Sequence, residues 1–306
     1  MNRESIFFNQ AELMLQVIPF VAKEACFALK GGTAINFFHL DMPRLSVDID
    51  LTYVPIEPRE DSLKKMSNAL SNIADRIEKA HGKIKVQRSK ASGGKRVTKL
   101  FVTNGKFQIK IEPNEVIRGT VFPTEERELS DKVQEEFSLS ATIHTLSFAD
   151  LYGGKLCAAL DRQHPRDIFD VKALLEERGI TDDIRKAFVV YLASHDRPIH
   201  ELIDPVRKDI RQIYEKEFTG MTVEPIAYDK LVEIREKYIV LLSKCLLREE
   251  REFLLSIKEG TPNWKTLGVS GIERLPAIQW KLENIKKMKK EKHADAVRRL
   301  KEKLGL

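Results

Sequence analysis

The sequence predicts an α+β protein in which a sheet-containing N-terminal part precedes an α-helical C-terminal part. Two observations support this class. Alternating apolar residues and short turn motifs recur through residue 112, as in β-strands, whereas long helical patterns dominate from Thr181 onward. The change in composition near Gly179 predicts two domains in the 306-residue chain, residues 1–179 and residues 180–306. This length suits one large domain or two ordinary ones.

The spacing of apolar residues in the first part predicts helices and strands in turn. Residues 9–23, 34–39 and 61–81 have helical spacing. Residues 26–29 and 47–54 are predicted as strands, and residues 83–87, 97–103 and 106–112 as a three-stranded meander. The meander turns at Ser92-Gly93-Gly94 and at Asn104-Gly105, and the second pair is a strong hairpin signal.

Helical signals follow the meander. After an acidic stretch at 124–136, Ser147 and Asp150 have the spacing of a capping box for a helix that ends near Arg162. Pro165 suits the first turn of the next helix, and Gly179 suits its end. Further helices are predicted over about 182–194, 228–258 and 275–304, with Trp264 and Trp280 as expected core anchors.

Basic charge is concentrated in two segments. The chain has 52 Lys and Arg against 46 Asp and Glu, a formal net charge of +6. Residues 281–306 hold ten basic and four acidic residues, and residues 83–110 hold nine basic residues and no acidic one. Such local charge favours phosphate polyanions, although a solvated charged face is the usual alternative. The C-terminal segment fits either an RNA backbone or an acidic protein partner.

Several classes of protein are excluded by the sequence. The three cysteines Cys26, Cys157 and Cys245 are far apart in apolar stretches, which argues against a disulfide framework or a structural zinc site. The N-terminus lacks the pattern of a signal peptide, and no apolar run approaches the length of a membrane helix. We therefore expect a cytoplasmic protein with no membrane contact.

Acidic side chains mark the most informative strand. Alternation along residues 47–54 places Asp48 and Asp50 on one face and the apolar residues on the core face. Two carboxylates in this arrangement can converge on a hard cation such as Mg²⁺. The last meander strand carries Glu112 on its polar face, so three carboxylates are expected to meet if the strands are neighbours.

A glycine-rich turn precedes this acidic strand. The backbone N–H groups of Gly31-Gly32-Thr33, at a strand-to-helix turn, can cradle a phosphate. A polyphosphate beside a metal site indicates phosphoryl or nucleotidyl transfer. Without this turn, the two aspartates would be better explained as solvent-facing strand residues.

The order of the motifs resembles the DNA polymerase β-like nucleotidyltransferase superfamily and, more closely, the AbiEii toxins of type IV toxin–antitoxin systems. The resemblance reaches from about residue 28 to about residue 285 and rests on Leu29-Lys30-Gly31-Gly32-Thr33-Ala34, Arg44-x-Ser46-x-Asp48-Ile49-Asp50-Leu51, Lys110-Ile111-Glu112, Lys155-Leu156-x-Ala158-x-x-x-Arg162, Pro165-Arg166-Asp167-Ile168-Phe169-Asp170, and Pro262-x-Trp264 with Leu275-Pro276-Ala277-x-x-Trp280-Lys281-Leu282. The superfamily commonly has Gly-Ser where this chain has Gly-Gly-Thr, a variant that is usual in the AbiEii branch.

The resemblance implies a role for each matching residue. A polymerase β-like nucleotidyltransferase domain with a mixed sheet would hold an NTP through Gly31, Gly32, Thr33, Ser46, Lys155 and Arg166. Asp48 and Asp50 would hold Mg²⁺ or Mn²⁺ as catalytic residues, and Glu112 would complete the metal site or help deprotonate the attacking hydroxyl. Lys155 and Asp167 would also be catalytic, with Lys155 as a phosphate clamp that Asp167 orients.

The residues around Lys155 also allow a structural explanation. Lys155 and Arg162 are two helical turns apart and share a face, and Arg166, Asp167 and Asp170 begin the next predicted helix. The structural alternative is that Arg162, Arg166, Asp167 and Asp170 form a set of ion pairs that joins the two helices.

The resemblance implies metal-dependent transfer of NMP from an NTP to an RNA hydroxyl, with the 3′ end of tRNA as the first expected acceptor. As the toxin of an abortive-infection (phage defence) system, the protein would block translation until a cognate antitoxin neutralises it. The alternatives are a non-catalytic RNA- or partner-binding protein on the same scaffold, and nucleotidyl transfer to a small-molecule or protein hydroxyl.

Overall fold

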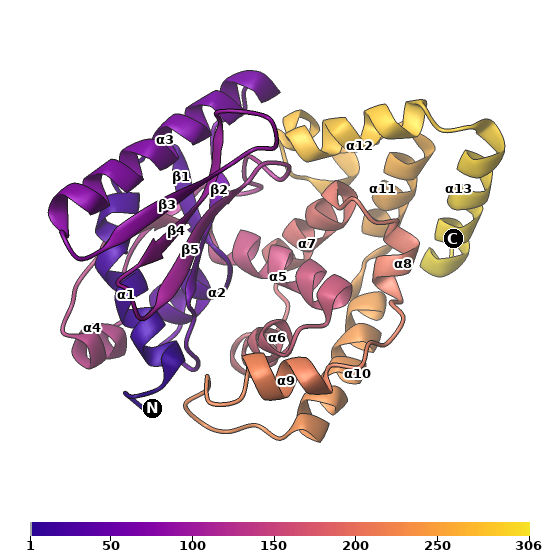
Figure 1. Cartoon of the computed structure of the whole chain (residues 1–306). Coiled ribbons are helices and arrows are strands. Elements are labelled where there is room, and N and C mark those ends of the chain that lie inside the picture. Colours follow the sequence, from indigo (N-terminus) through magenta and orange to yellow (C-terminus); the bar gives the residue numbers. More distant parts are fainter. Residues whose placement is uncertain (1) are drawn as a thin grey trace. The chain divides into compact units, whose positions relative to one another are not determined.

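The chain forms two compact units that differ from the domains expected from the sequence. The computed structural model describes residues 2–306 (Figure 1). Unit 1 contains the described residues up to Leu151 together with Phe218–Pro225, and unit 2 contains Tyr152–Glu217 and Ile226–Leu306. The division was expected at Gly179, but it falls inside a helix, because residues 152–179 pack with the later helices.

A mixed seven-stranded sheet organises unit 1. Its order is β3-β4-β5-β2-β1-β7-β6. The strands are β1 (Phe27–Lys30), β2 (Asp48–Tyr53), β3 (Lys85–Lys90), β4 (Val97–Thr103), β5 (Gln108–Asn114), β6 (Glu125–Glu128) and β7 (Thr142–Thr145). Strand β2 runs antiparallel to β1 and parallel to β5, so the acidic strand lies in the middle of the sheet between the glycine turn and the meander. The expected α+β class with a mixed sheet is confirmed.

Helices supply the core on the apolar side of this sheet. They are α1 (Ile6–Val21), α2 (Gly31–Ala34) with its π-helical continuation η1 (Ile35–His39), α3 (Arg59–Ala80) and α4 (Asp131–Phe137). Helix α1 contacts β2, β5 and β7, while α3 contacts β3 and β4 and packs against α1. Ile49, Leu51 and Tyr53 of β2 are fully buried, which confirms the predicted core face.

A distant segment completes unit 1. Residues Phe218–Pro225 return to the loop that precedes β2. The Leu45 N–H donates to the Met221 carbonyl at 2.7 Å, and the Val223 N–H donates to the Pro43 carbonyl at 3.0 Å. The backbone of Arg44 thereby forms an isolated antiparallel β-bridge with Thr222. This short contact of strand type fixes the loop immediately before the acidic strand.

Unit 2 is helical, as expected. Its elements are the remainder of α5 (Phe148–Arg162), α6 (Pro165–Glu177), α7 (Asp182–Ser194), α8 (Ile199–Ile203), α9 (Arg211–Glu217), α10 (Tyr228–Cys245), α11 (Arg248–Glu259), the 3₁₀ turns η2 (Trp264–Leu267) and η3 (Ile272–Arg274), α12 (Pro276–Lys286) and α13 (Lys290–Leu304). Gly153 lets α5 approach α7 closely, because a Cβ there would lie 2.7 Å from the Ala187 Cβ. In the described part of the chain, no helix is long and apolar enough to cross a membrane.

Three local expectations need correction. Strands β6 and β7 were not predicted, because β6 is a polar run with mostly exposed side chains at the sheet edge. The helix expected over 228–258 is two helices, since the backbone is extended at Leu246 and Leu247. Trp280 is not a core anchor: it is 50% exposed, whereas Trp264 packs against Phe253.

Candidate active site

The glycine turn brings the backbone of the chain against the acidic strand. Strand β1 ends at Lys30, whose cross-strand partner is Asp50, and the chain turns at once into α2. Gly31 has φ +73°, and a Cβ at this position would lie 3.0 Å from Oδ2 of Asp50. Both the left-handed backbone and the close approach require glycine. The Asp50 carboxylate and the backbone of the turn therefore adjoin.

The second glycine covers a buried arginine. A Cβ on Gly32 would lie 2.5 Å from Nη2 of Arg44 and 3.1 Å from Oγ of Ser46. Arg44 is 2% exposed, and its Nη1 donates to the Leu45 carbonyl at 2.8 Å. We did not assign Arg44 a role, although it begins the Arg44-x-Ser46-x-Asp48 motif. Its guanidinium places a permanent positive charge beneath the turn.

The two hydroxyls of the predicted nucleotide site are buried within unit 1. The Thr33 hydroxyl donates to the Asp48 carbonyl at 2.6 Å and makes a second hydrogen bond with the Ser46 hydroxyl at 2.9 Å. Thr33 is 1% and Ser46 6% exposed. These contacts tie the glycine turn to the start of β2. Their expected contact with a nucleotide stays a prediction.

The acidic strand and the meander meet as expected. Strand β2 pairs with β5 so that Asp48 lies beside Lys110 and Asp50 beside Glu112. A cavity of about 430 Å³ opens over this region. It is lined by Lys30, Asp50, Thr98, Lys99, Glu112, Pro113, Asn114 and Glu115. Both carboxylates and ammonium groups line the cavity, which suits a ligand that carries both a cation and phosphate groups.

Glu112 is bound by lysines rather than gathered into a cluster of three acids. Its two oxygens lie 2.9 Å from Nζ of Lys99 and 2.8 Å from Nζ of Lys110. Partial burial would raise the pKa of Glu112, but hydrogen bonds from Lys110 and Lys99 hold it below its ordinary value. Within residues 2–306, no group of three or more His, Cys, Asp and Glu side chains is arranged to hold a metal ion. Two ammonium groups thus contact the third acid, and the metal-binding role of Glu112 stays a prediction.

Lys110 belongs to the same electrostatic group. Burial would lower its pKa, but hydrogen bonding to Glu112 and the charges of Asp48, Glu112 and Asp50 raise it. The lysine therefore stays protonated and partly offsets the negative charge of the acidic strand.

Part of the basic meander is neutralised within unit 1. Arg88 contacts Asp75 and Glu78, and Arg96 contacts Glu115. Five other cations of this segment form no ion pair with any residue that the structure describes: Lys83, Lys85, Lys90, Lys95 and Lys106. The acid-free segment is therefore less charged towards solvent than its composition indicated.

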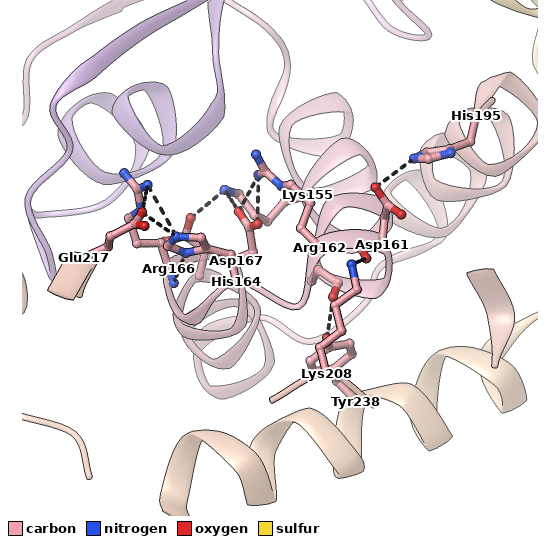
Figure 2. Close-up of polar contacts among 12 residues, drawn as sticks. Lys155, Asp161, Arg162, His164, Arg166, Asp167, His195, Lys208, Glu217 and Tyr238 are labelled. Carbon is pink, nitrogen blue, oxygen red and sulfur yellow. Dashed lines mark hydrogen bonds and ion pairs between the residues drawn. The ribbon is translucent and has the colours of Figure 1, made fainter. Parts of the chain in front are cut away.

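A second predicted group lies in unit 2, on α5 and α6 (Figure 2). Nζ of Lys155 lies 2.8 Å from Asp167 and 2.9 Å from Asp170, and Arg162 also contacts Asp167 at 2.8 Å. Lys155 and both aspartates are buried. Burial would raise the pKa of Asp167, but the charges of Lys155 and Arg162 hold it well below its ordinary value. Both readings of these residues agree with this geometry, since the ion pairs join the two helices and also fix the direction of the lysine.

Arg166 belongs to a neighbouring contact. Its guanidinium lies 3.5 Å from His164 and 3.6 Å from Glu217, and Figure 2 shows this group beside the Lys155 group. The expected ion pairs between α5 and α6 thus form among Arg162, Lys155 and the two aspartates, whereas Arg166 contacts Glu217 instead. The nucleotide contact of Arg166 stays a prediction.

Comparisons with known proteins agree with this architecture. The family model described as "Nucleotidyl transferase AbiEii toxin, Type IV TA system" matches residues 12–283. Among solved structures, the chain is similar to MenT4, a nucleotidyltransferase toxin from Mycobacterium tuberculosis H37Rv, with a TM-score of 0.62 and 13% identity over 93% of this chain and 95% of that one. At this identity the likeness concerns the fold. No match was found among curated proteins.

The family model covers most of the chain, including the glycine turn, the acidic strand and the Lys155 group. An NTP is the substrate that this enzyme class uses, and an antitoxin is the counterpart that a toxin–antitoxin system provides. The chain therefore belongs to the AbiEii family of nucleotidyltransferase toxins of type IV toxin–antitoxin systems.

Proposed function

We propose that this enzyme transfers NMP from an NTP to a hydroxyl of RNA in a metal-dependent reaction, with the 3′ end of tRNA as the first acceptor. The observation that carries the proposal is the approach of Asp50 to the glycine turn, where a Cβ on Gly31 would lie 3.0 Å from the carboxylate. A phosphate bound by the turn and a cation bound by the strand would be neighbours in this arrangement. Modified tRNA would block translation and arrest growth.

Asp48 and Asp50 fit a divalent cation without a third protein ligand. Mg²⁺ is commonly bound through one or two carboxylates, with substrate phosphates and water completing its shell. The two aspartates alternate on β2 and are both partly exposed. When bound, Mg²⁺ or Mn²⁺ would neutralise charge that develops on the transferred phosphate. Glu112 acts beside this pair by holding Lys99 and Lys110 in position.

The turn supplies the phosphate contacts of the proposal. Because the Thr33 and Ser46 hydroxyls bind one another, the groups that Gly31, Gly32 and Thr33 offer to a ligand are mainly backbone N–H groups. Arg44 adds positive charge beneath Gly32. A glycine turn supported in this way favours a polyphosphate.

Lys155 is the proposed clamp for the charge of the transferred group. An ammonium group has three donors, and two contacts direct the Lys155 ammonium towards Asp167 and Asp170. One donor remains for a phosphate oxygen. Asp167 and Asp170 would thereby orient the lysine rather than contact the reacting atoms.

The acceptor hydroxyl would attack the α-phosphate, the bond to the β-phosphate would break, and pyrophosphate would leave.

The test of the proposed function is incubation of the protein with Mg²⁺, each labelled NTP in turn and total RNA. We expect one NTP to label RNA, competition by purified tRNA, and a loss of at least about a hundredfold in Asp48→Ala. Asp61→Ala, which removes an exposed acid of α3, is the control. No labelling with any NTP, or full labelling by Asp48→Ala, contradicts the proposal.

A further inference from the structure

The corner between α12 and α13 carries an exposed tryptophan and a run of lysines. Trp280 is 50% exposed, although Lys281 and Leu282 next to it are buried. Lys287 follows seven residues later, which places it on the same side of the helix about two turns away. Lys289, Lys290 and Lys292 continue as exposed residues into α13. We call Trp280, Lys258, Lys287, Lys289, Lys290 and Lys292 the corner surface.

The lysines of the corner surface lack acidic partners. Across residues 2–306, none of the five forms an ion pair. Four other cations of the C-terminal basic segment are paired: Lys286 contacts Glu283, Lys303 contacts Asp204, and Arg298 and Arg299 contact Asp295. Among the described residues, Lys281 and Lys301 have no acidic partner. The positive charge that the sequence concentrates in residues 281–306 is therefore left uncompensated mainly at the corner.

Lys258 extends this charge from the surface into unit 2. It lies near the end of α11 and is 9% exposed, and its carbonyl oxygen is 2.7 Å from Nε2 of His293 on α13. Burial and the charge of Lys292 lower the pKa of Lys258. Lys258 also affects Lys281. Burial, the larger cause, and the positive charge of Lys258 lower the pKa of Lys281 to about 8. Lysines from α11, α12 and α13 thus repel one another, and an anion at this place would relieve the repulsion.

The exposed indole distinguishes between two kinds of polyanion. An acidic protein segment would use the lysines but would not need an exposed aromatic face beside them. A nucleic-acid strand uses both, because phosphates follow the cations and unpaired bases stack on aromatic rings. The combination of Trp280 with unpaired lysines favours the nucleic acid.

We propose that the corner surface binds an RNA strand with unpaired bases, with phosphates along the lysines and a base against Trp280. This inference rests on the proposed function only in taking RNA, rather than DNA, as the strand. It concerns binding, and it adds no residue to the transfer reaction.

The test measures binding in the absence of any NTP, by fluorescence anisotropy with a labelled 20-nucleotide oligouridylate. The variant Lys287→Gln/Lys289→Gln/Lys290→Gln should bind at least about tenfold more weakly. Its slope of log affinity against log salt should fall by about 2, at roughly 0.7 per phosphate contact. The control Lys230→Gln/Lys237→Gln/Arg248→Gln removes three exposed cations that are paired with acids, and it should bind as the wild type does.

Trp280→Ala separates stacking from charge. It should weaken binding by about tenfold and leave the salt slope unchanged, because no phosphate contact is lost. Circular dichroism should give the same melting temperature for all variants, since the substituted side chains are exposed. If Trp280 and the corner lysines only supported the fold, the triple variant and Trp280→Ala would not differ in salt slope.

The failure of this inference is distinguishable from the failure of the proposed function. Wild-type affinity and slope in the corner triple variant would overturn the inference, even if the enzyme labels RNA. Loss of antitoxin neutralisation in the triple variant, with unchanged RNA affinity, would overturn it in favour of an acidic protein partner. Tight RNA binding that depends on the corner, without NMP transfer, would support the inference and contradict only the proposed function.

Discussion

Replacing Gly31 by alanine tests the link between the glycine turn and the acidic strand. The residue has φ +73°, and a Cβ would lie 3.0 Å from Oδ2 of Asp50, whereas ordinary contacts begin at 3.4 Å. The left-handed backbone costs an alanine about 1–2 kcal/mol. The carboxylate must also move by a few tenths of an ångström. Since a 1 Å displacement of a reacting group can cost about a hundredfold in rate, we expect a loss of roughly ten- to a hundredfold.

Gly93→Ala is the matched control for this experiment. Gly93 has φ +70°, but a Cβ there would meet nothing within 4 Å. Both variants should therefore lose similar stability, about 2–8 °C in melting temperature for a domain of roughly 150 residues. Only Gly31→Ala should lose NMP transfer, measured as label incorporated into RNA at equal amounts of folded protein. Full activity in Gly31→Ala, or an equal loss in Gly93→Ala, would refute the reasoning.

Three further predictions concern the buried and half-buried acids. Asp167→Asn removes one carboxylate from the buried Lys155 ammonium, so the free energy of unfolding, measured in urea, should fall by about 3 kcal/mol. The control Glu233→Gln changes an exposed acid that also contacts two lysines, and it should leave the urea midpoint of unfolding unchanged. Equal losses in the two variants would count against the argument. Because the folded pKa of Asp167 lies well below its ordinary 3.8, its stabilisation is fully present at neutral pH and is lost as the pH falls towards the folded pKa. Wild type should therefore lose stability below about pH 5 more steeply than Asp167→Asn. Parallel curves would contradict this. Glu112→Gln should keep the rate of NMP transfer within about tenfold of wild type and leave the Mg²⁺ requirement unchanged, because lysines bind the Glu112 oxygens. Asp50→Asn should abolish transfer. A raised Mg²⁺ requirement in Glu112→Gln would make Glu112 a metal ligand.

Strong local patterns predicted most of unit 1. The meander was expected over three strands and forms β3, β4 and β5, because alternation and the Asn104-Gly105 turn act locally. Strand β6 has no such pattern. Its charged residues form a strand only because β7 offers backbone partners at the sheet edge. Edge pairing of this kind depends on the assembled sheet and cannot be recognised from the segment alone.

The candidate site shows the same limit for side chains. Alternation predicted which residues share the polar face of the sheet, and the neighbouring positions of Asp50 and Glu112 follow from it. It did not predict which charges would pair on that face. Lys99 comes from β4 and reaches Glu112 across the strand boundary, so its effect depends on sheet order. Arg44 was missed because only the fold shows that it lies beneath Gly32.

The return of residues Phe218–Pro225 to unit 1 has a consequence for synthesis of the protein. A ribosome makes the glycine turn and the acidic strand early, but the backbone groups of Leu45 and Pro43 gain their partners only when Met221 and Val223 have followed. In a nascent chain, the loop that carries Arg44 therefore lacks these two hydrogen bonds until most of the protein has been translated. Prematurely terminated products would lack both hydrogen bonds, so incomplete translation would expose the cell to less of the toxin's activity.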